Sequence, residues 1–413
     1  MRHHRGVAIR QAPEALSDQA LAALHDVDEG RPFGLYLHVP FCATRCGYCD
    51  FNTYTAGELG SSSSPQSWME GVRRELDAAA ELLSPVRKVS TVFVGGGTPS
   101  LLGGDGLADL LGAVRDSFDL AHGAEVTTES NPESTSPEFF ATLRGAGYTR
   151  ISLGMQSAAR HVLAVLERTH TPGRALAAAR EAADAGFEHL NMDLIYGTPG
   201  ESDDDLAASI DAVLSVPIDH VSAYALIVED GTAFARKVRR GEVPMPDDDV
   251  LAARYEMLDE RLTQAGLTWY EVSNWSRAQR DSGLPETESA CRHNEMYWRS
   301  DDWWGVGPGA HSHVRGVRWW NQKHPATYSA SLASGALPVA GHEILTAEDM
   351  HTEAVMLRLR MRDGLARAVL DDRERMRADV SVAAGLLVRR GDAYVLTDRG
   401  RLLADGVVRD ILD

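Results

Sequence analysis

Three cysteines that lie close together near the start of the chain form its clearest chemical motif. Cys42, Cys46 and Cys49 follow one another with gaps of three and two residues, and the fourth cysteine of the chain, Cys291, is far away in sequence. Thiolates bind iron, and three of them on one loop can each hold one iron of a [4Fe–4S] cubane while the fourth iron keeps an open coordination position. The amino and carboxylate groups of S-adenosylmethionine (SAM) chelate such an open iron, so the spacing predicts a cluster that binds SAM.

A structural zinc site is the alternative for this motif. Structural zinc takes four tetrahedral ligands, usually from paired C-x2-C units. Here one gap has three residues and no fourth cysteine is near, so we favour the cluster. The spacing C-x3-C-x2-C, with the aromatic residue Tyr48 before the last cysteine, resembles the radical SAM superfamily.

Polar residues and glycines recur at the ends of the apolar, β-rich runs that follow. The turn Gly95–Pro99 follows the second run, and Glu129 ends the third. Gln156 follows the fourth run, Arg168 lies just beyond it, and Asp193 lies on the fifth. Glycines let a ligand approach the backbone closely, and an acid, an amide and a guanidinium group can bind ribose hydroxyls, adenine or a carboxylate. Each residue alone could serve as well in a turn, a cap or the surface, but their ordered recurrence predicts a nucleotide site.

Alternating strands and helices are needed to bring these residues together. Short apolar runs predict strands at 35–39, 91–94, 126–129, 150–155, 190–196 and 220–228. Apolar residues at helical spacing predict helices at 68–83, 107–118, 137–146, 174–185 and 205–216. Such alternation predicts a parallel sheet with right-handed crossovers. We therefore expect an α/β protein with a partial (β/α)6 barrel of the radical SAM type and a site at the carboxyl ends of its strands.

Four segments are predicted along the chain. Residues 1–33 lack a sustained pattern and are predicted to be a loosely held N-terminal extension, and residues 34–275 are predicted to form the barrel core. Residues 276–345 connect the barrel to the last segment, and the polar stretch at 277–288 predicts a loop. In residues 346–413, a helix at 347–362 precedes two apolar segments around a turn at Gly391. This order predicts a small C-terminal α+β domain of winged-helix type.

The composition excludes several classes of partner. The chain has 413 residues, of which 60 are acidic and 41 basic, for a net charge of -19, whereas nucleic-acid binding and polybasic membrane anchors rest on excess positive charge. No run approaches the ~18 apolar residues that a membrane span requires, and the N-terminus lacks the apolar segment of a signal peptide. Crowded cysteines without a disulfide framework indicate a reducing compartment. We therefore expect a cytoplasmic protein that binds no nucleic acid and has no integral membrane segment.

From residue 34 to the C-terminus the chain resembles one branch of the superfamily, the oxygen-independent coproporphyrinogen III oxidases and the related HemW heme chaperones. The resemblance implies that Tyr36, Gly96 and Glu129 contact the SAM bound to the cluster. It also implies contacts to a second SAM position that is assigned in the oxidases, from Tyr48, Gly97, Thr98, Gln156, Arg168 and Asp193. Whether one or two SAM molecules bind stays open.

The segment 293–298, which reads HNEMYW, adds a candidate heme site. A neutral imidazole is a common axial ligand of heme iron, and neighbouring aromatic rings can cover the porphyrin face. From chemistry alone, the commoner role of a histidine such as His293 is hydrogen bonding in an aromatic-rich core. The segment resembles the HNxxYW signature of HemW proteins, in which the histidine takes part in heme binding, so the resemblance implies heme at His293. Further heme-ligand candidates of lower rank are Cys291, His311 and His313.

Phe51 separates the two members of this branch. In the oxidases a further cysteine follows two residues after the last cluster ligand, and here that position is Phe51. We therefore expect a heme chaperone that binds heme and delivers it to respiratory hemoproteins. The alternatives are an oxygen-independent coproporphyrinogen III oxidase and a radical SAM enzyme for an unrelated small substrate, so whether the chain is an enzyme stays open. Peripheral association with a membrane and a homodimer are compatible with this expectation.

Overall fold

Six parallel strands form the centre of the main sheet in the computed structural model, which describes residues 15–24, 30–85, 87–277 and 289–413. In their order across the sheet they are β1 (Phe33–Val39), β4 (Val89–Gly96), β5 (Leu120–Ser130), β6 (Arg150–Gln156), β7 (His189–Tyr196) and β8 (His220–Ala225). These are the six strands predicted from the apolar runs, with the last ending at Ala225 rather than at residue 228. Strands such as β1 and β6 are buried on both faces, which explains why they read as nearly continuous apolar runs.

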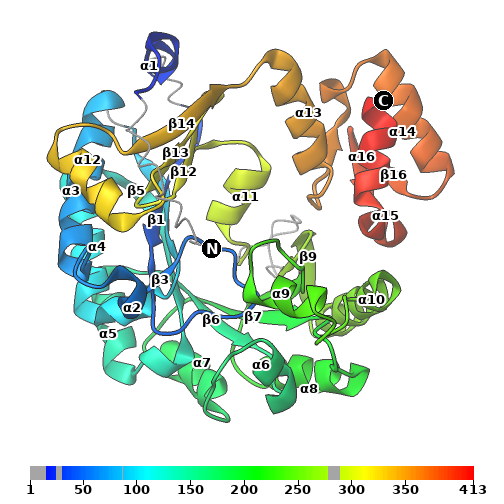
Figure 1. The fold of residues 1–413 in the computed structure, drawn as a ribbon. Helices are drawn as coiled ribbons and strands as arrows, with labels where there is room; N and C mark the ends of the chain where they lie inside the picture. Colours follow the sequence, from blue (N-terminus) through cyan, green and yellow to red (C-terminus); the bar gives the residue numbers. More distant parts are fainter. Residues whose placement is uncertain (1–14, 25–29, 86, 278–288) are drawn as a thin grey trace, which may run out of the picture.

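Helices cover the outer face of these strands (Figure 1). They are α3 (Pro65–Leu82), α4 (Gly103–Ser117), α5 (Pro137–Ala146), α7 (Arg174–Asp184) and α8 (Asp203–Leu214), close to the predicted spans. Three of them begin after a serine whose hydroxyl accepts a hydrogen bond from a backbone N–H of the first turn, namely Ser64, Ser136 and Ser202. The alternation of strands and outer helices confirms the α/β fold class with its partial (β/α)6 barrel.

The sheet continues beyond the parallel strands at both edges, so the barrel stays open. Beyond β1 lie β11 (Asp302–Val306), which runs parallel to β1, and then the antiparallel strands β12 (His311–Val314), β13 (Val317–Asn321) and β14 (Val339–Ile344). Beyond β8 lie the antiparallel strands β10 (Asn274–Arg277) and β9 (Leu267–Glu271). The predicted connecting region at 276–345 therefore supplies β11 to β14, together with α11 (Arg292–Trp298) and α12 (Pro325–Ala333). Of the loop predicted at 277–288, only Arg277 lies within the described residues.

A short helix packs the described part of the N-terminal segment onto the barrel. α1 (Asp18–Leu24) buries Ala20 and Leu24 in the main apolar core, and Leu16 joins them. This part of the extension is therefore not loosely held, while residues 1–14 and 25–29 lie outside the described part. The other elements of the barrel region are β2 (Phe41–Cys42), β3 (Tyr54–Thr55), α2 (Ala56–Leu59), α6 (Arg160–Val165), α9 (Ala233–Arg239) and α10 (Asp248–Gln264).

Residues 346–413, which we call the C-terminal module, have an apolar core of their own. Its elements are α13 (Ala347–Arg358), β15 (Leu365–Ala366), α14 (Asp372–Ala383), β16 (Leu387–Arg390), β17 (Ala393–Leu396), α15 (Asp398–Leu402) and α16 (Ala404–Leu412). β16 and β17 form the hairpin predicted around Gly391, and α13 ends at Arg358, short of the predicted residue 362. The module lies at the open side of the curved sheet, with α11 between the two (Figure 1). Across the described ranges, no helix combines the length and the apolar character needed to cross a membrane.

Candidate functional site

One large cavity opens at the carboxyl ends of the parallel strands and has a volume of about 1480 Å³. Its walls come from the loop after β1, the ends of β4 to β8, α11, and residues of the C-terminal module that include Leu402. Every residue expected to bind the cluster, SAM or heme borders this cavity: Tyr36, Cys42, Cys46, Tyr48, Cys49, Gly96, Gly97, Thr98, Glu129, Gln156, Arg168, Asp193 and His293. Their binding roles stay predictions, but the fold brings all of them to one place.

Hydrogen bonds fasten the cysteine loop to the barrel. The side-chain amide of Asn52 donates to the carbonyl oxygens of Pro308 and Lys323, at 2.9 and 2.7 Å. Nε2 of His38 lies 2.9 Å from the backbone carbonyl oxygen of Asn52. The three cysteines of the motif are free and half-buried. The far end of the loop is therefore held against the segments that follow β11 and β13, while the thiols border the cavity.

The donor set of this loop suits a cluster better than a single ion. Among the described residues, no three side chains of His, Cys, Asp or Glu come together closely enough to hold one metal ion. A cubane makes no such demand, because each thiolate binds a different iron. Burial raises the pKa of the Cys49 thiol to about 11, so a thiolate there needs a positive partner, and bound iron supplies that charge.

The glycine-rich turn after β4 lies directly against the cysteine loop. The backbone N–H of Gly97 donates to the carbonyl oxygen of Val39 at 2.7 Å, and that of Thr98 donates to Phe41 at 2.8 Å. A Cβ atom at Gly97 would lie 2.5 Å from the Phe41 carbonyl oxygen, so only glycine permits this approach. The Thr98 hydroxyl lies 3.8 Å from Sγ of Cys42. The turn therefore helps to position the first cysteine.

Two carboxyl groups border the cavity from β5 and β7. Glu129 accepts a hydrogen bond from the backbone N–H of Gly96 at 3.1 Å. Asp193 accepts from the Asn191 amide at 2.7 Å and from the Ser152 hydroxyl at 3.1 Å. Burial and the neighbouring Asp193 charge raise the pKa of Glu129 to about 8, and burial raises that of Asp193 to about 6. Both acids therefore lie where a positively charged ligand would favour their ionised forms.

Gln156 and Arg168 line the same part of the cavity. Gln156 has a left-handed backbone with φ of 68°, where the pairing of β6 with β7 shifts register. Such conformations are uncommon outside glycine and cluster at functional sites. Within the described chain, Nε of Arg168 is buried without a hydrogen-bond partner, and its charge interacts with Tyr48, Cys46 and Asp193. A guanidinium group at a cavity wall is suited to bind a carboxylate or a ribose oxygen.

His293 forms part of the cavity wall and is almost fully buried, with an exposed fraction of 1%. Its Nδ1 lies 2.8 Å from the Thr91 hydroxyl and its Nε2 lies 2.8 Å from the Tyr297 hydroxyl. Burial lowers the pKa of His293 to about 3, so the ring is neutral near pH 7. The ring stacks on Phe93 with 5.3 Å between centroids, and Phe93 in turn stacks on Tyr36 at 6.3 Å. These surroundings match a hydrogen-bonded histidine in an aromatic-rich core that also borders the cavity.

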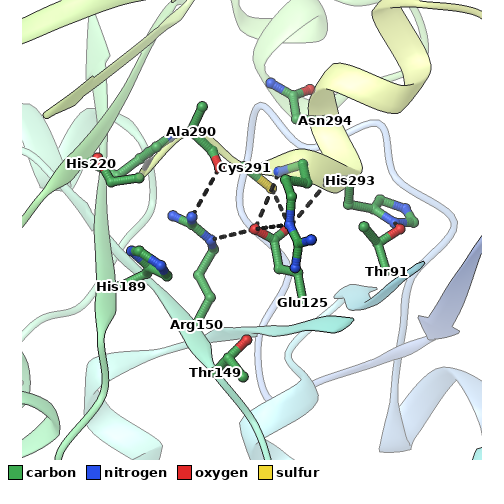
Figure 2. A network of polar contacts seen from close by, with 12 residues as sticks. Thr91, Glu125, Thr149, Arg150, His189, His220, Ala290, Cys291, His293 and Asn294 are labelled. Atoms are coloured by element: carbon green, nitrogen blue, oxygen red, sulfur yellow. Dashed lines mark hydrogen bonds and ion pairs between the residues drawn. The ribbon is translucent and has the colours of Figure 1, made fainter. Parts of the chain in front are cut away.

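A buried ion pair anchors α11 to the sheet (Figure 2). Glu125 of β5 accepts hydrogen bonds from the backbone N–H groups of Arg292 and His293, at 3.2 and 3.1 Å. It also pairs with Arg150 of β6 at 3.2 Å, and Arg150 donates to the Ala290 carbonyl oxygen at 3.0 Å. Burial works against the charge of Glu125, but Arg150 and the backbone donors outweigh it and lower the pKa of Glu125. Glu125 thereby satisfies N–H groups at the start of α11 that have no partner within the helix, and it fixes the backbone of His293.

The sequence did not single out Thr91, Glu125 or Arg150 as site residues. The sequence held one indication for Glu125 and Arg150. Both are charged residues within or beside a predicted buried strand, and a buried charge needs a partner. The strand predicted at 126–129 began one residue after Glu125, and β5 in fact extends to both sides of it. Thr91 carried no such signal, because threonine is common in strands.

The lower-ranked heme-ligand candidates lie elsewhere or are already engaged. Cys291 is buried and its thiol donates to Glu125 at 3.5 Å, so it belongs to the anchor of α11. His311 is exposed on β12, and Nδ1 of the buried His313 lies 3.0 Å from a backbone carbonyl oxygen. Neither of these two is among the described residues that border the cavity. Phe51 does border it and is 57% exposed.

Comparison with known proteins matches residues 36–213 to the radical SAM superfamily. The heme chaperone HemW of Mycobacterium tuberculosis is 60% identical over 98% of this chain and 100% of its own length. The heme chaperone HemW of Escherichia coli is 31% identical over 91% of this chain and 97% of its own. Among solved structures, the coproporphyrinogen III oxidase HemN of Escherichia coli superposes with a TM-score of 0.81 at 22% identity, covering 97% of this chain and 94% of that one. This last likeness concerns the fold alone.

Proposed function

Because the chain belongs to the HemW heme chaperones of the radical SAM superfamily, we propose that it binds heme at His293 and delivers it to respiratory hemoproteins. Membership of the superfamily implies a [4Fe–4S] cluster and SAM. In this proposal the three ligands share the cavity described above, and heme is the cargo of the protein.

The shared cavity is the observation that carries the proposal. The cysteine loop borders it after β1, and His293 borders it from α11. Its volume of about 1480 Å³ exceeds the roughly 300–1,000 Å³ of most small-molecule pockets. This size gives room for SAM and a flat macrocycle at the same time.

Cys42, Cys46 and Cys49 are the proposed ligands of the cluster. When bound, a cluster of this type supplies an open iron and an electron for SAM. Gly97 and Thr98 support this role because they tie the glycine-rich turn to the loop that carries the cysteines. All four cysteines of the chain are free, which supports a location in the reducing cytoplasm.

Residues at the strand ends are the proposed contacts of SAM. Tyr36, Gly96 and Glu129 are assigned to the SAM at the cluster, and Glu129 supplies a carboxylate for its positively charged end. The groups assigned to its nucleoside part or to a second SAM are Tyr48, Gly97, Thr98, Gln156, Arg168 and Asp193. The guanidinium group of Arg168 at the cavity wall supports a contact to an anionic or hydroxyl oxygen.

The test starts from protein reconstituted with iron and sulfide under anaerobic conditions. Heme binding is measured from the Soret band during titration with hemin, and coproporphyrinogen III turnover is measured with SAM and a reductant. A chaperone is expected to give a Soret band without decarboxylation. Turnover to protoporphyrinogen would overturn the proposal, and Phe51 in place of the oxidases' cysteine gives the reason to expect none.

His293→Ala is expected to weaken hemin binding by about tenfold or more, because it removes the proposed axial ligand. The measurement is the hemin titration together with the spectrum of the bound heme. His311→Ala is the matched control, because His311 lies on β12 away from the cavity and its loss should leave binding unchanged. An unchanged Soret band in His293→Ala would remove His293 from the heme site.

Cys46→Ala is expected to abolish the cluster, because the two remaining thiolates leave half of the four irons without a protein ligand. Iron and sulfide analysis and the absorbance of the reconstituted protein measure the loss. Cys291→Ala is the control, since Cys291 donates to Glu125 and is buried apart from the loop. Full iron content in Cys46→Ala would contradict the cluster assignment.

The proposed division of the chain follows the predicted segments. Residues 34–275 carry the cluster and SAM sites, residues 276–345 carry the heme-binding segment, and residues 346–413 form a separate docking module. The separate apolar core of the C-terminal module supports this division, and the strands β11 to β14 tie the middle segment closely to the barrel.

A further inference from the structure

Both ring nitrogens of His293 are occupied by hydroxyl groups of the protein. Nδ1 lies 2.8 Å from Oγ1 of Thr91, and Nε2 lies 2.8 Å from the phenolic oxygen of Tyr297. A histidine can bind iron only through a nitrogen that carries a free lone pair. The proposed ligand is therefore not available as it stands, and one of the two hydroxyl groups has to leave.

Counting hydrogens identifies the nitrogen that carries the lone pair. A neutral imidazole has one N–H and one acceptor nitrogen. The Thr91 hydroxyl can donate a hydrogen bond to Sδ of Met296, 3.9 Å away, and its oxygen can then accept a hydrogen bond from Nδ1–H. The Tyr297 hydroxyl has Nε2 as its one partner within the described residues, so it is satisfied inside the protein by donating its hydrogen to Nε2. The tautomer that satisfies every group is Nδ1–H, with Nε2 accepting from Tyr297.

This arrangement is built into the strands beneath α11. Gly34 on β1 pairs with Thr91 on β4. A Cβ atom at Gly34 would lie 2.4 Å from Cε of Met296 and 2.6 Å from Oγ1 of Thr91. Any other residue at position 34 would push the threonine and the methionine apart, so glycine there preserves the contacts on the Nδ1 side of His293.

Tyr297 is the partner with room to move. It is half-buried and borders the cavity, whereas Thr91 is buried within β4. Its ring meets His293 and Trp303 edge to face, with centroid distances of 4.8 and 4.7 Å. Rotation of the tyrosine toward the cavity would uncover Nε2 without disturbing the backbone of α11.

We propose that Thr91 and Tyr297 hold His293 as a capped heme ligand: Thr91 keeps the proton on Nδ1, and the Tyr297 hydroxyl covers Nε2 until heme iron displaces it. This inference rests on the proposed binding of heme at His293. Histidines that bind metals generally donate their other ring N–H to a neighbouring oxygen, which is the part played here by Thr91. Thr91 is then a positioning residue, and Tyr297 is a competitor for the site of the iron.

Tyr297→Phe tests the cap by removing only the hydroxyl group. Hemin binding is expected to become about two- to tenfold tighter, because the iron no longer has to displace a neutral hydrogen bond. Tyr148→Phe is the matched control, since it removes one buried tyrosine hydroxyl that donates to the Leu107 carbonyl oxygen outside the cavity. Unchanged or weaker binding in Tyr297→Phe overturns the cap, and weaker binding makes the phenol itself a heme contact. If the unaltered protein binds no hemin, the proposed function fails and this inference fails with it.

Thr91→Val tests the positioning role, and Thr91→Ser is its conservative partner. Valine removes the acceptor for Nδ1–H, so hemin binding is expected to weaken by about tenfold, whereas serine is expected to restore it. The readouts are the hemin titration and the iron–histidine stretching frequency of the ferrous complex, which the loss of the hydrogen bond should lower. Full binding and an unchanged frequency in Thr91→Val would overturn the role of Thr91.

The tautomer is measurable without any heme. In protein with 15N-labelled histidine, long-range 15N–1H correlation spectra distinguish a protonated Nδ1 from a protonated Nε2, and His293→Gln identifies the signals of His293. We expect Nδ1–H in the unaltered protein. A predominant Nε2–H form would overturn the proposal whatever the hemin titrations give.

Discussion

Glu129 and Asp193 border the same cavity, but their surroundings differ in a way that sets their charge. Asp193 accepts hydrogen bonds from Asn191 and Ser152, whereas Glu129 has one backbone donor, Gly96. Because Glu129 has so few donors, burial and the nearby Asp193 charge dominate, and these two effects raise the pKa of Glu129 to about 8. Near pH 7 and without a ligand, Glu129 is therefore mostly protonated.

SAM affinity is expected to rise with pH and to level off above about pH 8. SAM carries a positively charged sulfonium, which attracts the ionised carboxylate, so binding releases the proton of Glu129. Below the pKa, affinity should fall by up to about tenfold per pH unit. The measurement is calorimetric titration of cluster-loaded protein with SAM between pH 6 and 9. Glu129→Gln should flatten the profile after the titration of SAM itself is subtracted, and the same slope in both proteins would contradict this assignment.

At the scale of single residues, the sequence identified the groups that stand out from an apolar run. Glu129, Gln156 and Asp193 are polar residues at or near the ends of predicted strands, and all three border the cavity. Thr91 could not be found in this way, because its partner His293 is 202 positions further along the chain. The two hydrogen bonds of the His293 ring could not be predicted either, because a sequence motif gives the type of a residue and not the contacts of its atoms.

At the scale of elements, α11 depends on a charge that lies outside it. The helix has seven residues, too few to be stable alone, so its placement rests on contacts with the sheet. Glu125 supplies them by accepting from Arg292 and His293 while it pairs with Arg150. The position of the proposed heme ligand is therefore set from β5 and β6.

Glu125→Gln is expected to destabilise the protein by about 3–5 kcal/mol, because it leaves the buried guanidinium of Arg150 without its partner. Hemin binding should weaken as well, since the start of α11 loses an ionised acceptor. Urea unfolding and the hemin titration measure the two effects. Arg292→Ala is the control, because its half-exposed side chain lies 4.0 Å from the same carboxylate and its loss should cost less than about 1 kcal/mol. Equal unfolding midpoints for the two variants would refute the anchoring role.

The strands predicted from sequence were those with strong apolar runs, and the strands that were missed had none. β12 and β13 are short and mix histidine, arginine and tryptophan with apolar residues, so neither period nor composition marks them. β11 was missed for another reason, because its partner strand β1 lies far away in sequence. The extension of the sheet beyond its centre was therefore found only in the structure, whereas the central six strands were predicted from the sequence.

At the scale of the whole molecule, the C-terminal module is attached beside the cavity through Arg401. Its guanidinium donates to Asp259 of α10 at 2.9 and 2.5 Å and to the Tyr255 hydroxyl at 3.2 Å. It also lies 4.7 Å from the centre of the Trp269 ring, a cation–π contact. Because Leu396 and Leu402 of the module border the cavity, this attachment completes one of its walls.

Arg401→Ala is expected to loosen the module and to destabilise its attachment by about 2–3 kcal/mol, because Asp259 loses its charged partner and keeps the hydrogen bond from the Trp275 indole N–H. Limited proteolysis should cut the chain faster near residue 346, and thermal unfolding should show an earlier transition for the module. Asp398→Ala removes the second carboxylate partner of Arg401. Because the Asp398 side chain is 96% exposed, this variant should change neither result. Proteolysis at the same rate in Arg401→Ala and in the unaltered protein would show that the attachment does not depend on this residue.

The stacked rings of Tyr36, Phe93 and His293 have a consequence for the order in which the protein is loaded. Tyr36 is a proposed SAM contact and His293 the proposed heme ligand, and Phe93 stacks on both. If heme shifts the ring of His293, the energy of that shift depends on whether SAM already holds Tyr36. Thermodynamic reciprocity then requires that SAM alters the affinity for heme by the same factor by which heme alters the affinity for SAM. A recipient that takes the heme away would thereby change the affinity of the protein for SAM, so the occupancy of one site would affect binding at the other.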